Sequence, residues 1–197
     1  MPTTIRLTLG ALVVATDGVC GLVKSLLVDP TVQRVVHLVV EPEHRIGLAR
    51  LVPVELLSGT EADADNGVEL SCELAAVEAL PMAEASEVVR GVGVGYVYVH
   101  GPAPLVREVH ELVPKGEGSL TPGTPVMARD GELGKVAGFD VDNQHHQIVS
   151  LLVSEGRFPW GHKTAALPIT CMASLGTRVE LNMTIAEATR LASSQRR

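Results

Sequence analysis

The chain has 197 residues, of which 46% are hydrophobic and 20% charged, and its formal net charge is −7. Residues 1–100 carry 6 Lys and Arg against 13 Asp and Glu, so the excess of acid lies in that half. Neither half has the basic stripe that binding to a phosphate backbone requires, and aromatic residues make up only 3%, so direct binding to nucleic acid is not expected. No run of 18 apolar residues predicts a transmembrane segment, and the N-terminus lacks the pattern of a secretory signal, which makes a cytoplasmic location the expectation.

A hairpin turn is predicted near the start of the chain. The apolar strand Leu12–Ala15 ends at Asp17-Gly18, and Asp-Gly is among the strongest short signals for a β-hairpin. Gly18 is expected to adopt a positive φ, where the Cβ of another residue would clash. Gly21 then opens the following strand, where a residue without a side chain allows a bend or a β-bulge.

Short strands and one helix follow this hairpin. The strands are apolar or β-branched runs separated by polar turns, at residues 22–29, 35–40, 52–57 and 68–71. A short helix over 73–80 ends before Pro81, which cannot continue it. The first 82 residues are therefore interpreted as a small β unit closed by a helix.

Residues 83–118 form a predicted linker. Gly and Val alternate within 88–104 and lead into Tyr96-Val-Tyr98-Val, which indicates a strand with both tyrosines on one face. The tyrosines are candidate partner-binding residues if this strand is an exposed edge that pairs with another chain. Alternatively, they brace the two flanking units against each other.

The second half of the chain repeats the first. Placing Asp17 on Asp130 gives an offset of 113 residues, the difference between 130 and 17. In this register most apolar strand positions agree, and the phrase Asp-Gly-x-x-Gly recurs. The structural turn residues that the repeat predicts are Asp17, Gly18, Gly21, Asp130, Gly131 and Gly134. The recurrence of the phrase is therefore interpreted as a recurrence of fold.

Each unit ends in a helix, and the second helix has the clearer start signal. Thr184 and Glu187 have the spacing of a capping box, in which each side chain accepts a hydrogen bond from the other residue's backbone N–H. A sheet of short strands must curl to bury its apolar residues at this length, so each unit is expected to form a small barrel. The predicted fold is mainly β, with two tandem barrels at 1–82 and 119–197, each followed by a short helix, and a Gly/Tyr-rich linker strand within 83–118.

The pattern resembles that of the PRC-barrel domain. It consists of an apolar strand, Asp-Gly-x-x-Gly-x-Val, a Val-Asp turn, a Val-rich strand, a loop and a strand that contains Pro. Residues 155–169, E-G-R-F-P-W-G-H-K-T-A-A-L-P-I, are similar to the Trp loop of tandem bacterial members, whereas the first unit has no Trp there. The resemblance covers residues 5–82 and 119–192. It implies two PRC-type barrels that act as a binding or scaffolding module, and the family has no shared set of catalytic residues to transfer.

No catalytic, cofactor-binding or metal-binding residues are predicted. Cys20, Cys72 and Cys171 are widely spaced, and each aligns with an apolar residue of the other copy, so they are expected to be small apolar residues of the core. The seven histidines show no spacing that converges on a metal ion.

Phe158 and Trp160, in the predicted loop of the second unit, are the other candidate partner-binding residues. Trp is enriched at the energetic centres of protein interfaces. The alternative is that Trp160 folds back and caps the open end of its own barrel.

Three functions are compatible with these features. The leading hypothesis is a non-enzymatic module that binds another protein through a barrel edge, the groove between the repeats or the Trp loop, with a homodimer as a further possibility. The second is an accessory factor in RNA metabolism or ribosome maturation that docks on a ribosomal protein. The third is a small-molecule binder or enzyme with a site between the repeats, marked by convergent polar residues such as His100, His110 or His162.

Overall fold

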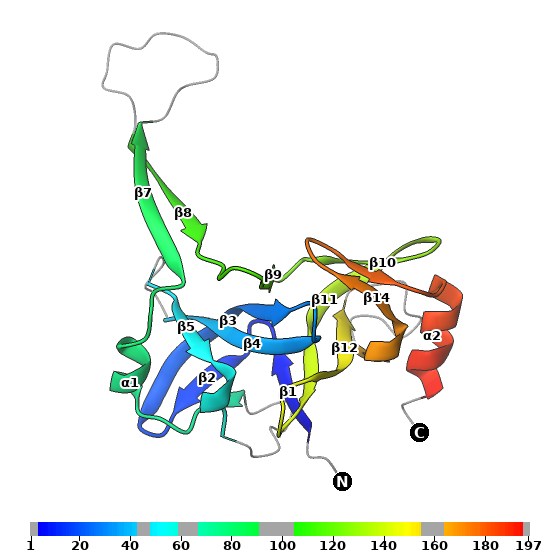
Figure 1. The fold of residues 1–197 in the computed structure, drawn as a ribbon, viewed down its shortest axis with the longest axis horizontal. Helices are drawn as coiled ribbons and strands as arrows, with labels where there is room; N and C mark the ends of the chain where they lie inside the picture. The colour runs from blue at the N-terminus through cyan, green and yellow to red at the C-terminus, as the bar shows by residue number, and fades with distance from the viewer. Residues whose placement is uncertain (1–3, 43–47, 59–66, 91–104, 155–163, 195–197) are drawn as a thin grey trace.

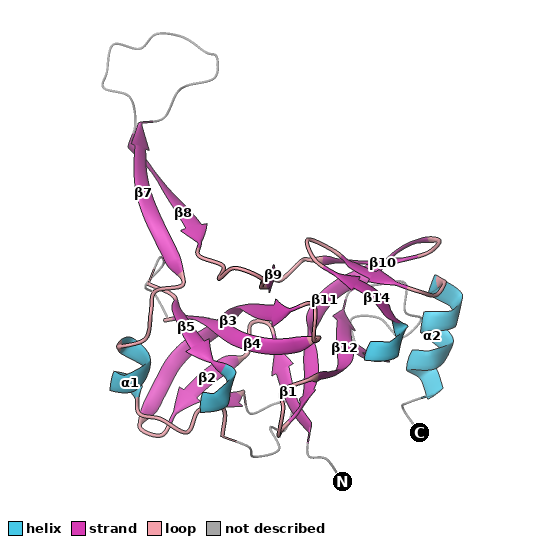
Figure 2. Cartoon of the chain, in the orientation of Figure 1, coloured by secondary structure: helices cyan, strands magenta, loops and turns pink. Residues whose placement is uncertain are grey.

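The chain folds mainly into β-strands, which form curled sheets with few helices. Its structure, a computed structural model, describes residues 4–42, 48–58, 67–90, 105–154 and 164–194. Two curled sheets lie side by side, and a third, narrow sheet extends away from them (Figure 1). The helices are short and lie at the periphery (Figure 2). A mainly β fold with curled sheets was expected from the sequence and is confirmed.

The first sheet contains the strands of the first unit. In order across the sheet they are β5 (Arg50–Pro53), β4 (Arg34–Glu41), β3 (Gly18–Asp29), β2 (Leu12–Ala15) and β6 (Val68–Glu69). Neighbouring strands are antiparallel except β2 and β6, which are parallel. The short 3-10 helix η1 (Val54–Leu56) follows β5, and α1 (Leu74–Glu78) follows β6. The helix expected over 73–80 is thus present, with a regular part of five residues.

The second sheet has the same plan. Its strands, in order, are β13 (Ala165–Pro168), β12 (Ile148–Ser154), β11 (Gly131–Asp142), β10 (Pro125–Ala128), β15 (Val179–Leu181) and β14 (Met172–Leu175). Strands β10 and β15 are parallel, as β2 and β6 are in the first sheet. The 3-10 helix η2 (Ile169–Cys171) follows β13, and α2 (Ile185–Ser194) follows β15.

The two long central strands, β3 and β11, match position by position. Each has 12 residues, and the order of buried, intermediate and exposed residues is the same in both. The pairing register shifts between Val13 and Val14 in the first hairpin and between Val126 and Met127 in the second, which are equivalent positions. Because β2 then pairs with Gly21 and β10 with Gly134, the strands bulge beside these glycines.

Each sheet receives one strand from the other half of the chain. Strand β1 (Thr4–Thr8) pairs with β11 of the second sheet, and β9 (Gly118–Leu120) pairs with β3 of the first. The exchange is reciprocal in register, since Leu7 lies opposite Phe139 and Leu120 lies opposite Leu26. Both pairs of partners are related by the offset of 113 residues. Membership of a sheet therefore does not follow chain order at these two strands.

The two sheets also meet at a pair of equivalent turns. The Val35 N–H donates to the His146 carbonyl at 3.2 Å, and the Ile148 N–H donates to the Gln33 carbonyl at 2.9 Å. Gln33 and His146 both have positive φ, 53° and 55°. The two hydrogen bonds are interchanged by the same offset, so the contact is locally two-fold symmetric.

Buried apolar side chains of both sheets form one continuous cluster. It includes the exchanged Leu7 and Leu120, both almost completely buried, together with Phe139 of β11. Burying a leucine stabilises a fold by about 1.5–3 kcal/mol. The exchange therefore ties both halves into one core.

The predicted linker strand is not confirmed. Strand β7 (Glu84–Arg90) and strand β8 (Leu105–Glu111) flank residues 91–104 and pair with each other as an antiparallel hairpin. The Gly/Tyr-rich stretch itself lies outside the described residues. The hairpin extends away from the curled sheets (Figure 1). None of the described helices is both long enough and apolar enough to cross a lipid bilayer.

Candidate functional site

The four aromatic candidates, Tyr96, Tyr98, Phe158 and Trp160, lie outside the described residues. His100 and His162 lie outside them as well, and only the backbone of His110, in β8, is described. The alternatives stated for Trp160 and for the tyrosines therefore remain predictions.

The Asp-Gly turns are shifted by one residue from the expected position. Strand β2 ends at Ala15, which pairs with Gly18, so the loop consists of Thr16 and Asp17. The second hairpin has the same geometry, and Gly131 there has φ of +145°. A Cβ at Gly18 would meet no heavy atom within 4 Å, so steric crowding does not explain this glycine.

Gly21 has a stronger steric requirement than Gly18. Its φ is +145°, and a Cβ there would lie 2.1 Å from the Glu41 carbonyl oxygen. The strand bulge thus brings the backbone of β3 too close to that of β4 for any other residue.

The aspartates of both turns also cap the helices. The Leu74 N–H, the first of α1, donates to Asp17 Oδ1 at 2.7 Å, and the Ile185 N–H, the first of α2, donates to Asp130 Oδ1 at 2.8 Å. These bonds satisfy N–H groups that have no partner within the helix. This second role was not predicted, because it joins residues more than fifty positions apart.

Helix α2 has the additional cap that the sequence predicted. The Thr184 N–H donates to Glu187 Oε2 at 2.8 Å, and the Glu187 N–H donates to Thr184 Oγ1 at 3.4 Å. At α1 the N-cap residue, Glu73, makes no side-chain capping bond. Asp17 is therefore more important to α1 than Asp130 is to α2.

All three cysteines are free thiols that pack in or against the core, as expected. Cys20 and Cys171 are buried, and Cys72 is half-buried. Burial raises the pKa of the Cys20 thiol, so this group stays protonated at neutral pH. In the described part of the chain no three His, Cys, Asp or Glu residues gather as metal ligands would.

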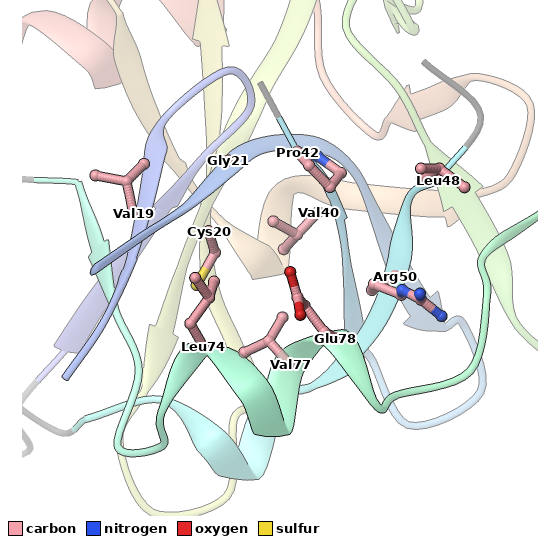
Figure 3. Close-up of a pocket in the computed structure, with 10 residues that line it drawn as sticks. All are labelled: Val19, Cys20, Gly21, Val40, Pro42, Leu48, Arg50, Leu74, Val77 and Glu78. Carbon is pink, nitrogen blue, oxygen red and sulfur yellow. The ribbon is translucent and has the colours of Figure 1, made fainter. Parts of the chain in front are cut away.

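A cavity of about 420 Å³ lies between α1 and the curled first sheet. Figure 3 shows α1 along its lower side, with β3 and β4 above it. Its apolar lining consists of Val19, Val40, Pro42, Leu48, Leu74 and Val77. Cys20 and Gly21, at the strand bulge, complete the wall. The bulge and the short helix together leave this space.

Two charged residues line the same cavity. The Glu78 carboxylate points from α1 into its middle, whereas the Arg50 side chain lies to one side and points away from Glu78 (Figure 3). Arg50 Nη1 donates to the Leu80 carbonyl at 2.9 Å. Among the described residues Glu78 has no hydrogen-bond or ion-pair partner. The cavity therefore combines apolar walls with one unpaired carboxylate.

The equivalent seam of the second unit is built from other side chains. Leu133 takes the place of Cys20 and is almost completely buried. Helix α2 packs on β11 and β13 and buries Ala188 and Ala192 there. Ala188 occupies the helix position of Val77, four residues before Ala192. The longer helix and the larger Leu133 fill the space at this seam.

A second cavity, of about 350 Å³, lies on the outer side of the second sheet. Its buried Asp140 accepts hydrogen bonds from Arg6 Nε at 2.8 Å, from Arg6 Nη2 at 3.2 Å and from Ser150 Oγ at 2.8 Å. The hydrogen bond to Asp140 raises the pKa of Arg6. In the first sheet Leu27 holds the position of Asp140 and is fully buried in a small apolar cluster. We interpret the Arg6–Asp140 pair as a structural link that holds β1 on β11.

The base of the β7–β8 hairpin is attached to the first sheet by hydrogen bonds and charge. The Ala83 N–H donates to the Ala49 carbonyl at 2.8 Å, and the Leu112 N–H donates to the Ala83 carbonyl at 2.7 Å. Lys24 Nζ contacts the nearly buried Glu84 at 2.5 Å and Glu41 at 3.2 Å. Burial lowers the pKa of Lys24, but its two carboxylate partners raise it further, so it lies above the usual value.

Three apolar side chains are exposed around this base. Met82, Leu112 and Val113 are 44%, 47% and 39% exposed, respectively. We call these three residues the hairpin-base patch. The sequence analysis missed it, because the patch joins two segments separated by about 30 positions and depends on the hairpin that brings them together.

Comparison with known proteins does not place the chain in a family. No protein-family model matches the sequence, and a search of curated proteins also finds no match.

Proposed function

We propose that the chain is a non-catalytic module, built of two PRC-type barrels, that binds another protein. The β7–β8 hairpin is the observation that carries the proposal. Within the described part of the chain its two strands pair only with each other, over seven residues each. The outer edge of a strand presents unpaired N–H and C=O groups, to which an extended segment of a partner can add as a further strand.

The attachment of the hairpin supports this proposal. A two-stranded sheet alone is only marginally stable in water. The bonds between Ala83, Ala49 and Leu112 and the contact of Lys24 with Glu84 tie its base to the first sheet. A strand edge held in advance loses less conformational entropy when a partner binds.

The hairpin-base patch provides an apolar anchor next to this edge. Main-chain hydrogen bonds give affinity in strand addition, and side-chain contacts give specificity. Met82, Leu112 and Val113 are placed to contact apolar side chains of the added segment. We therefore propose an extended partner segment with apolar residues that face the hairpin-base patch.

Affinity capture from the native extract tests the proposal. The bait is the full chain, as wild type and as the triple variant Met82→Ser, Leu112→Ser, Val113→Ser. We expect the partner captured by wild type to bind the triple variant at least tenfold more weakly when both proteins are purified and titrated. All three positions are exposed, so the substitutions should leave the fold intact.

Val32 and Val149 provide the matched control, since they are 53% and 44% exposed at other places. The double variant Val32→Ser, Val149→Ser should bind the partner as wild type does. Equal affinity of the triple variant and this control would contradict docking at the hairpin. A Trp160→Ala variant tests the Trp loop separately, and a loss of binding confined to that variant would move the proposed surface to the loop.

A further inference from the structure

We propose that the cavity between α1 and the first sheet binds a small organic cation with an aliphatic body, such as a primary alkylamine. This site is separate from the hairpin-base patch, and the proposal does not depend on the function proposed above. It rests on the shape of the cavity, on one unpaired carboxylate and on the charge of the surrounding chain.

The size and lining of the cavity suit a small aliphatic molecule. Its volume of about 420 Å³ lies in the range of pockets that bind small ligands, about 300–1,000 Å³. The apolar side chains from β3, β4 and α1 include Val19, Val40, Leu74 and Val77. Each methylene group that leaves water for such a surface contributes about 0.8 kcal/mol before the costs of binding.

Glu78 specifies the charge of the ligand. Its carboxylate points into the middle of the cavity and has no described partner (Figure 3). An ammonium group has three N–H donors and forms a charge-assisted hydrogen bond with a carboxylate. A cation whose carbon chain lies along the apolar wall can place its ammonium group on this carboxylate.

Arg50 does not reverse this preference. Its guanidinium points away from Glu78 and donates to the Leu80 carbonyl. Residues 1–100, which contain all residues that line the cavity, hold 13 Asp and Glu against 6 Lys and Arg. This excess of negative charge attracts cations and repels anions.

Glu78 is not required for folding by any interaction in the described structure. It is exposed, and it lies at the C-terminal end of α1, where a negative charge is unfavourable because the free carbonyls are there. Its replacement should therefore leave the stability of the chain unchanged or slightly increased. A loss of binding on replacement could then be assigned to the missing carboxylate.

Saturation-transfer NMR on the full chain with four probes tests the charge and the body of the ligand. The probes are n-hexylamine, hexanoate, n-hexanol and methylamine. We expect n-hexylamine to bind most tightly, hexanoate to bind most weakly of the three six-carbon probes, and methylamine to give no signal. Tighter binding of hexanoate than of n-hexylamine, or equal binding of all six-carbon probes, would overturn the proposal.

Variants locate the site. Glu78→Gln should weaken n-hexylamine binding about three- to tenfold, as expected for the loss of a partly exposed charge pair. Arg50→Gln should strengthen it, because an opposing charge is removed. Glu73→Gln is the matched control, because Glu73 is exposed on the same helix but does not line the cavity. Equal effects of Glu78→Gln and Glu73→Gln, or weaker binding by Arg50→Gln, would overturn the proposal.

Cys20→Leu is a second, independent variant. It places in the first unit the residue that the second unit has as Leu133, and so fills the cavity from the sheet side. We expect it to abolish n-hexylamine binding while the chain remains folded. Unchanged binding in this variant would show that the amine binds elsewhere.

Discussion

The seams between helix and sheet in the two units have the same backbone plan but different contents. In both, an Asp-Gly turn caps the helix through its aspartate, and a bulge beside a glycine bends the long central strand. In the first unit a five-residue helix and Cys20 leave a cavity, whereas in the second a longer helix packs over the buried Leu133. The comparison shows that the turns and bulges determine the frame, and that side-chain volume determines whether a binding space remains in it.

The largest effects are expected where the two halves are most alike, at the exchanged strands. Leu7→Ala and Leu120→Ala each remove a fully buried leucine from the common core, so each should lower the free energy of unfolding by about 2–5 kcal/mol. Urea unfolding followed by circular dichroism measures both. Thr4→Ala, at an exposed position of β1, is the control and should change stability by less than about 0.5 kcal/mol. A Leu120→Ala variant as stable as this control would contradict the exchange of β9.

The aspartate caps should distinguish the two seams. Asp17→Ala and Asp130→Ala each remove a capping bond worth about 0.5–2 kcal/mol. Because α2 retains the bonds between Thr184 and Glu187, hydrogen exchange should accelerate more in α1 of the first variant than in α2 of the second. Equal acceleration in the two helices would mean that the capping box gives α2 no additional protection.

The cavity itself should contribute little to stability. Cys20→Leu adds apolar volume to a seam that already has room for it, so the free energy of unfolding should change by less than about 1 kcal/mol. Thermal unfolding checks this value. A loss of several kcal/mol would mean that Cys20 is packed too tightly for the cavity to lie beside it.

The smallest difference is expected at the turns that follow the long strands, and it should depend on pH. Partial burial raises the pKa of Asp142, but hydrogen bonds from the N–H groups of His145, Gln147 and Gln144 lower it further, below its usual value. The equivalent Asp29 accepts from the Thr31 N–H. A lowered pKa stabilises the fold above the unfolded-state pKa of about 3.9, and this contribution is lost as the pH falls through the folded-state value.

The variant Asp142→Ala tests this effect. The difference in unfolding free energy between wild type and Asp142→Ala should be largest near neutral pH and should narrow below about pH 4. Urea titrations at several pH values measure it, with Asp29→Ala as the comparison. A difference that stays constant from pH 7 to pH 3 would contradict the proposed stabilisation of the charged form.

Local features of the fold were predictable from the sequence, and non-local ones were not. The alternation of apolar residues, the bulge at Gly21 and the capping box at Thr184 depend on neighbouring residues, so the sequence specifies them directly. The exchange of β1 and β9 depends on which of two similar sheets a strand joins, and the pattern of Ile5 and Leu7 fits either.

The candidate site was missed for a related reason. Sequence analysis favoured aromatic and histidine residues, because these carry recognisable chemistry, whereas the cavity arises from missing volume. One signal was present: Cys20 aligns with the larger Leu133, and a smaller residue at an equivalent core position indicates space. The orientation of Glu78 depends on where α1 packs, and the repeat alone does not determine this.

A methyl NMR titration of the full chain with n-hexylamine tests the central claim most directly, because it observes both seams in one sample. The account predicts progressive shifts for methyl groups of Val19, Val40, Leu74 and Val77, with Leu133 and Ile185 unaffected. Shifts of equal size at both seams, or none at the first, would contradict it.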